Sequence, residues 1–137
     1  MSLIQQYGIE AGDIVSRQKR GVPLITHYGI PLGYNHMGQY LFIENMVNDC
    51  VRVITAEDFL QNSTGIQVEK TGNRQNRQRI IDTALSYKGT PYSLTSFNCE
   101  HFVNLVRHGQ AKSKQVSNAT AFLGLTALVL VVAKTIR

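Results

Sequence analysis

The sequence predicts an α+β fold in which an antiparallel β-sheet comes first and helices follow. Three observations predict it. The first half of the chain has short runs of β-branched and aromatic residues separated by Gly, Pro, Asn and Asp. The second half has apolar residues at helical spacing. Consecutive short strands favour antiparallel pairing, because each parallel pair needs a long crossover connection.

Five short segments fit strands of this sheet. We expect them at residues 14–15, 27–32, 40–44, 51–54 and 66–68. A basic loop that contains Pro23 is expected at residues 17–23. Pro31 lacks a backbone N–H, so the strand at 27–32 is expected to lie at an edge of the sheet or to end early.

Two helices are expected after the strands. The first ends at Gly89, and its apolar face consists of Ile80, Ile81, Ala84 and Leu85. The second begins after Asn98, which is a good N-cap residue, and ends at Gly109. Its apolar face consists of Phe102, Val103 and Val106.

Composition limits the class of protein. The 137 residues suit one domain, and 43% hydrophobic with 17% charged residues are typical of a globular chain. The net charge of +5 and a pI of about 9.4 favour an anionic partner. We expect a membrane surface rather than nucleic acid, because the chain has no Trp and its aromatic residues do not alternate with basic ones. Two cysteines are too few for a disulfide framework.

The C-terminal segment differs from the rest, so we divide the chain into a domain at residues 1–110 and a basic linker with a hydrophobic tail at 111–137. Lys112 and Lys114 precede an uncharged stretch at 116–133, and Lys134 and Arg137 follow it. As a helix, residues 119–133 would span about 22 Å, against about 30 Å of bilayer hydrocarbon. A tail anchor or a deep interfacial helix is expected, in preference to a helix packed in the protein core. The N-terminus lacks a charged start followed by an apolar run, so we expect an intracellular protein held at a membrane.

Cys99 is the candidate nucleophile. If Asn98 caps the second helix, Cys99 lies in its first turn, where unpaired backbone N–H groups and the helix dipole favour a thiolate. The same N–H groups are suited to stabilise the oxyanion that forms when a carbonyl is attacked. The alternative is that Cys99 is only a small buried hydrophobic residue.

His27 is the candidate general base, and Glu44 is the candidate third residue that orients its ring. Asn45 is the alternative to Glu44. The other histidines are expected to be structural or solvent-exposed: His36, His101 and His108. No pair of His or Cys residues has a matching second pair, so neither a metal site nor a cofactor is expected.

At these residues the chain resembles the lecithin:retinol acyltransferase family, which includes small phospholipase A/acyltransferases. The run Asn98-Cys99-Glu100-His101-Phe102-Val103 resembles the catalytic Asn-Cys motif of that family, and His27-Tyr28-Gly29-Ile30 resembles its His-bearing strand. Gly12-Asp13-Ile14 resembles the opening strand, and residues 108–116 are similar to the link into a C-terminal anchor. The resemblance covers nearly the whole chain.

The resemblance implies a papain-like fold in permuted order, with the histidine before the cysteine. It also implies that Cys99 takes an acyl chain from a phospholipid as a thioester and passes it to an acceptor or water, with His27 as the base. The family usually has a second His on the following strand, where this chain has Phe42-Ile43-Glu44.

Two other functions compete with lipid acyl transfer. One is a thiol peptidase or amidase of the same superfamily. The other is a non-catalytic interaction protein, because certain picornavirus proteins share the His-box and Asn-Cys pattern.

Overall fold

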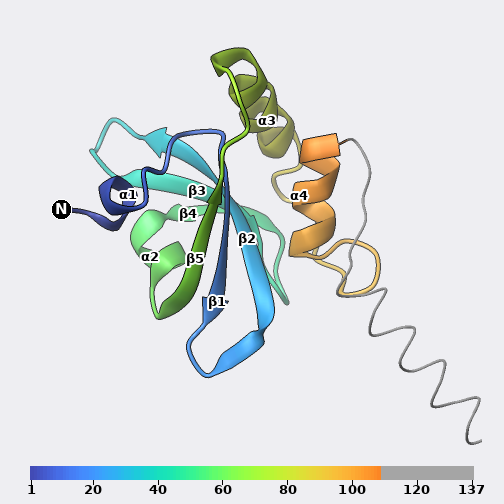
Figure 1. Cartoon of the computed structure of the whole chain (residues 1–137). Helices are drawn as coiled ribbons and strands as arrows, with labels where there is room; N and C mark the ends of the chain where they lie inside the picture. The colour runs from blue at the N-terminus through green and yellow to red at the C-terminus, as the bar shows by residue number, and fades with distance from the viewer. Residues whose placement is uncertain (109–137) are drawn as a thin grey trace, which may run out of the picture.

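The computed structural model describes residues 1–108, with the backbone alone at residues 22–24 (Figure 1). The strands are β1 (Ile14–Lys19), β2 (Val22–Tyr34), β3 (Tyr40–Asn45), β4 (Val51–Thr55) and β5 (Ser63–Glu69). The helices are α1 (Leu3–Gln6), α2 (Ala56–Leu60), α3 (Arg74–Ser86) and α4 (Cys99–His108). The expected α+β class with an antiparallel sheet is confirmed.

The strands form one sheet in the order β4-β3-β2-β1-β5, and every neighbouring pair is antiparallel. The long strand β2 lies at the centre. Helices α3 and α4 cover one face of the sheet, and α1 and α2 lie on the other side (Figure 1). Side chains alternate between the two faces along each strand, so Ile14 packs toward α3 and α4 while Val15 packs toward α2.

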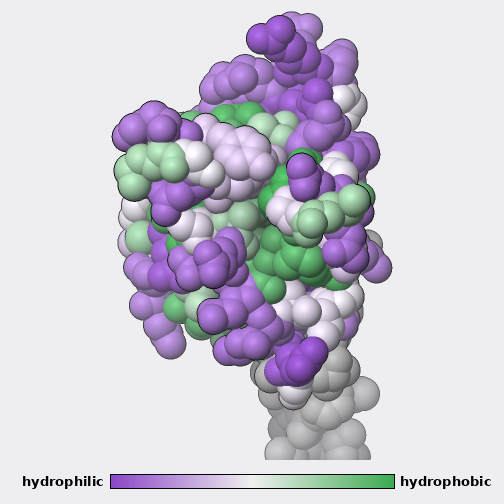
Figure 2. Space-filling model, turned by 90° about the vertical axis from the view of Figure 1, so that its left-hand side faces the viewer, coloured by the Kyte–Doolittle hydropathy of each residue, from purple (hydrophilic) through white to green (hydrophobic). Residues whose placement is uncertain are grey.

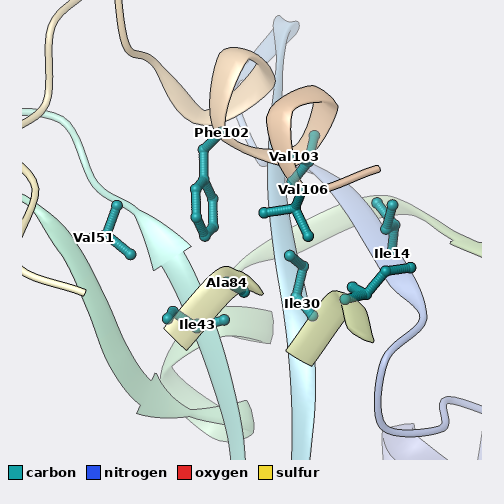
Figure 3. Packing of buried hydrophobic residues seen from close by; sticks show 9 residues of the cluster. Ile14, Ile30, Ile43, Val51, Ala84, Phe102, Val103 and Val106 are labelled. Atoms are coloured by element: carbon teal, nitrogen blue, oxygen red, sulfur yellow. The ribbon is translucent and has the colours of Figure 1, made fainter. Parts of the chain in front are cut away.

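The larger core lies between the sheet and the last two helices. The apolar face of α4 points toward Ile30 of β2 and Ile43 of β3 (Figure 3). That face is the expected one, and its three residues are fully buried: Phe102, Val103 and Val106. In α3, Ile80 and Ala84 are buried as expected, whereas Leu85 is exposed.

A second core lies under α1 and α2. Phe42 of β3 stacks on Phe59 of α2, with ring centroids 4.5 Å apart. Figure 2 shows the face that carries these two helices, where hydrophobic residues in the middle are surrounded by hydrophilic ones. The sheet is therefore packed on both faces, and the middle of its central strand, residues 29–31, is buried between them.

Some local expectations are wrong. The basic loop expected at 17–23 is instead the end of β1, a tight turn at Arg20 and Gly21, and the start of β2. Polar residues form strand there because β1 has a hydrogen-bonded partner on each side, namely β2 and β5.

Pro31 lies in the central strand rather than at an edge. The pairing of β1 with β2 extends from Lys19 only as far as Val15 opposite Gly29, so Pro31 lies past it. No ladder donor is required from Pro31 at that point, and its carbonyl oxygen accepts a hydrogen bond from the Gly12 N–H, at 2.8 Å. A β-bulge next to Pro31 adjusts the pairing with β3.

The helix α3 ends at Ser86 with Tyr87 as its C-cap, earlier than expected. Gly89 adopts a φ of +90° in the following turn, and its N–H donates to the carbonyl of Val51. The expected end of α4 at Gly109 and the expected hydrophobic tail lie outside the described residues. Within residues 1–108, none of the helices has both the length and the apolar character needed to cross a bilayer.

Candidate active site

Cys99 is the first residue of α4, and it meets the edge of β2. Strand β3 pairs with β2 from Gly29 toward Tyr34 and ends at Asn45, so it does not cover β2 at Thr26. The Cys99 Sγ lies there, 3.7 Å from the carbonyl oxygen of Thr26, to which the thiol donates. The thiol therefore lies beside the backbone that carries His27.

The thiol of Cys99 is protonated at neutral pH. Burial raises its pKa to about 11, although the backbone N–H groups of Tyr28, Glu100 and Cys99 itself act in the opposite direction. We expected the N-terminus of the helix to favour a thiolate. The N–H groups of the helix do lower the pKa of the thiol, but the effect of burial is larger. A base must therefore take the proton when the thiol reacts.

His27 contacts Glu44, the residue expected to orient its ring. The imidazole Nε2 and the carboxylate Oε1 are 2.8 Å apart, and Glu44 is 1% exposed. Asn45, the alternative, points to the opposite face of the sheet, where its Nδ2 donates to the carbonyl of Phe97 at 2.7 Å. Asn45 thereby fixes the loop that leads into α4.

Arg52 holds the other oxygen of the same carboxylate. Its Nε donates to Oε2 of Glu44 at 3.0 Å from the directly opposite position on β4. Burial acts to raise the pKa of Glu44, but the contacts with His27 and Arg52 outweigh it and lower that pKa. Glu44 is thus an ionised carboxylate with both oxygens in use.

The Phe59 ring packs against the imidazole of His27, and Gly29 leaves room for it. The rings of His27 and Phe59 have centroids 5.7 Å apart. A Cβ at Gly29 would lie 2.5 Å from the Phe59 ring, so only glycine leaves room for that ring two residues after His27. This contact is a physical reason for glycine in the run His27-Tyr28-Gly29.

Asn98 lies directly before α4 and caps it. Its Oδ1 accepts hydrogen bonds from the N–H groups of Glu100 at 3.0 Å and His101 at 2.9 Å. In return the Asn98 N–H donates to Nδ1 of His101, at 3.1 Å. His101 is buried in this structural position, whereas His36 and His108 are exposed.

Sequence reasoning missed four residues around this site: Thr26, Arg52, Phe59 and Arg17. Arg52 had a detectable signal, because a hairpin turn after Asn45 brings opposite charges face to face on β3 and β4. Arg17 would also have been detectable if residues 17–19 had been predicted as strand, because Arg17 is the direct partner of His27 on β1. Phe59 had none, because its helix is short.

The chain belongs to the lecithin retinol acyltransferase family, whose model matches residues 8–112. Human phospholipase A and acyltransferase 2 is 54% identical over 43 residues, which are 31% of this chain and 26% of that protein. Human phospholipase A and acyltransferase 4 is 52% identical over 58 residues, 39% of this chain and 35% of that protein. The human type 3 protein is 49% identical over 45 residues, 29% of this chain and 28% of its own length. The matched segments therefore span about a quarter to a third of these relatives.

Proposed function

We propose that the protein is a phospholipase A and acyltransferase that uses Cys99 as nucleophile, His27 as general base and Glu44 to orient the imidazole. The observation that carries the proposal is the 2.8 Å contact between His27 and buried Glu44. It is combined with a thiol at the start of a capped helix, whose Sγ lies 3.7 Å from the carbonyl oxygen of Thr26, the residue before His27. Membership of the family supports it, since three human relatives are named phospholipase A and acyltransferase.

The contact with Glu44 decides which ring nitrogen acts as the base. An ionised carboxylate only accepts hydrogen bonds, so Nε2 of His27 carries the hydrogen in the neutral ring. The lone pair then lies on Nδ1, which is the nitrogen left to take the proton from Cys99. A positive charge that forms on the imidazole is stabilised by Glu44.

The reaction proceeds in two halves. The Cys99 proton passes to His27 Nδ1 while Sγ attacks the ester carbonyl carbon, and the backbone N–H groups at the start of α4 stabilise the oxyanion. The lysophospholipid oxygen leaves with the proton from His27, and a thioester remains on Cys99. An acceptor alcohol, amine or water then loses its proton to His27, attacks the thioester and regenerates the thiol.

Exposed apolar side chains on the two segments that contact Cys99 and Asn98 favour a lipid substrate. Ile25 is 59% exposed and directly precedes Thr26, which Cys99 contacts. Leu94 is 68% exposed, and its carbonyl oxygen accepts a hydrogen bond from the Nδ2 of Asn98. We propose that this apolar border, with the basic residues and the segment at 111–137, holds the site on an anionic membrane inside the cell.

The test is turnover on phospholipid vesicles, measured as fatty-acid release and acyl transfer. Cys99→Ala should abolish both products, whereas Cys50→Ala, which removes the other free cysteine, should leave them unchanged. Turnover that survives Cys99→Ala, or a folded wild-type protein without turnover, contradicts the proposal.

One observation favours the non-catalytic alternative. The Cys99 thiol is buried, has a pKa of about 11 and donates to a backbone carbonyl, as a structural cysteine does. That alternative predicts no turnover and a biological effect that Cys99→Ala leaves intact.

A further inference from the structure

Arg17 faces the candidate site from the neighbouring strand. It is the direct partner of His27 in the pairing of β1 with β2, so both side chains lie on the same face of the sheet. Its guanidinium carbon lies 5.1 Å from the centroid of the Phe59 ring, against which the His27 ring also packs. One aromatic ring thus supports both side chains.

The Nε of Arg17 has no hydrogen-bond acceptor among the described residues, although it is buried. None of the ion pairs found among these residues includes the guanidinium group of Arg17. The nearby carboxylate of Glu44 already uses both oxygens on His27 and Arg52. The face of Phe59 compensates only part of the cost of a buried cation, so the donors of Arg17 can receive a further anion.

The positive charge of Arg17 interacts electrostatically with Glu44 and with Cys99. Burial lowers the pKa of Arg17, and the charges of Glu44 and of an ionised Cys99 act in the opposite direction. Arg17 therefore interacts with the site through its charge, and its side chain is half-buried.

We propose that Arg17 binds the phosphodiester of the acyl donor while the ester carbonyl lies at Cys99. The proposal rests on the function proposed above and names the group that selects its substrate. A planar guanidinium matches the geometry of a phosphate, with two parallel hydrogen bonds. In a glycerophospholipid only a few bonds separate the acyl ester from the phosphate, so a phosphate-binding residue is expected close to the nucleophile. Arg17 is then a specificity-determining residue for phospholipids over phosphate-free esters.

The test compares Arg17→Gln and Arg17→Lys with Lys19→Gln, which removes one exposed charge from the same strand. Binding of a short-chain phosphatidylcholine is measured calorimetrically in a Cys99→Ala background, and turnover is measured in the otherwise unchanged protein. Arg17→Gln should weaken phosphatidylcholine binding at least about tenfold, as the loss of a charge-assisted hydrogen bond does, and Arg17→Lys less. A diacylglycerol of the same chain length should be bound and turned over equally by all variants. Lys19→Gln should behave as the parent protein, and circular dichroism checks that each variant is folded.

The inference is overturned if Arg17→Gln binds phosphatidylcholine as tightly as its parent, or if it weakens both lipids equally. It is also overturned if inorganic phosphate at the same concentration displaces the phosphatidylcholine, because the subsite would then take any phosphate. Arg17-dependent binding without turnover supports the subsite and contradicts the proposed function. Turnover that does not depend on Arg17 supports the function and contradicts the subsite.

Discussion

Glu44 is a buried carboxylate that two basic side chains contact on one face of the sheet. Its Oε1 lies 2.8 Å from His27, and its Oε2 lies 3.0 Å from Arg52. Because those contacts lower its pKa, Glu44 is ionised at neutral pH and fixes the hydrogen of the imidazole on Nε2. A carboxylate in this place can therefore do the work of the second histidine that the family resemblance implies.

Replacing this carboxylate by an amide should slow the chemical step. In Glu44→Gln, kcat on phospholipid should fall at least about tenfold, because nothing stabilises the imidazolium. KM should change little, since a side chain that is 1% exposed does not touch substrate. Asp49→Asn is the control: it also removes a carboxylate 3.2 Å from Arg52, but that carboxylate is half-exposed and does not contact His27. An unchanged kcat in Glu44→Gln would show that the residue does not assist His27.

The reactivity of Cys99 should follow its raised pKa. Alkylation by iodoacetamide requires the thiolate, so its rate at Cys99 should rise about tenfold per pH unit between pH 7 and 10 without levelling off. The expectation follows from a pKa of about 11. Peptide mass spectrometry reports the modification at Cys99 separately from that at Cys50. A rate that is already constant below pH 8 would indicate a preformed thiolate–imidazolium pair instead.

For single residues, the sequence predicted that Glu44 orients His27, and it placed Cys99 at the start of a helix. It did not predict the residues whose position depends on a neighbouring strand or helix. Arg17 comes beside His27 only through the pairing of β1 with β2, and Phe59 only through the packing of α2 on the sheet. The state of the thiol depends on burial, which one sequence does not provide.

Among the elements, α4 positions Cys99, and its first turn has a reciprocal cap. Asn98 accepts from the His101 N–H, and the Asn98 N–H donates to Nδ1 of His101. The second bond requires a neutral imidazole, since a protonated ring has no acceptor. Burial lowers the pKa of His101 below its ordinary value of 6.5, although Glu100 acts in the opposite direction.

This cap should make part of the stability depend on pH. Because the folded-state pKa of His101 is depressed, the unfolded chain binds the proton more readily. The stabilisation is therefore complete above about pH 6.5 and is lost as the pH falls through the folded value. His101→Gln keeps a capping acceptor without a titrating group, so its free energy of unfolding should fall less between pH 7 and pH 5 than that of the wild type. Urea unfolding at both pH values measures the two differences, and equal losses would contradict the role of His101.

The sequence predicted the five strands and two longer helices by pattern, but not where several of them end. Polar residues after Val15 continue as strand because partners on both sides satisfy the backbone of β1. Pro31 is tolerated in the central strand because β1 no longer pairs with it there. Such facts depend on the register of neighbouring strands, which local propensity does not contain.

In the whole molecule, ion pairs and close packing connect residues 10–13, which precede β1, with residues 70–77, which include the start of α3. Lys70 donates to Asp13 at 2.8 Å and to Glu10 at 3.2 Å, and Arg77 contacts Glu10 at 2.9 Å. Between them the chain passes so close to α3 that a Cβ at Gly12 would lie 2.6 Å from the Cβ of Arg77. Glycine at this position therefore sets how closely α3 approaches the sheet.

Two glycine substitutions separate backbone strain from this close packing. Gly8 and Gly12 have φ angles of +59° and +85°, but only Gly12 has atoms where a Cβ would lie. Gly8→Ala should cost about 1 kcal/mol for the left-handed backbone alone. Gly12→Ala should cost about 3 kcal/mol, because the clash with Arg77 adds to the same backbone cost. Urea unfolding provides both values, and equal losses would show that the contact does not constrain the fold.

The most direct test of the central claim is the intact mass of the protein after brief exposure to phospholipid and an acid quench. We predict one added acyl chain, located on Cys99 by peptide mapping, released by hydroxylamine as a thioester is, and missing in Cys99→Ala. A folded protein that turns over phospholipid without an adduct on Cys99, or that carries the acyl chain elsewhere, would contradict the assignment of Cys99 as nucleophile.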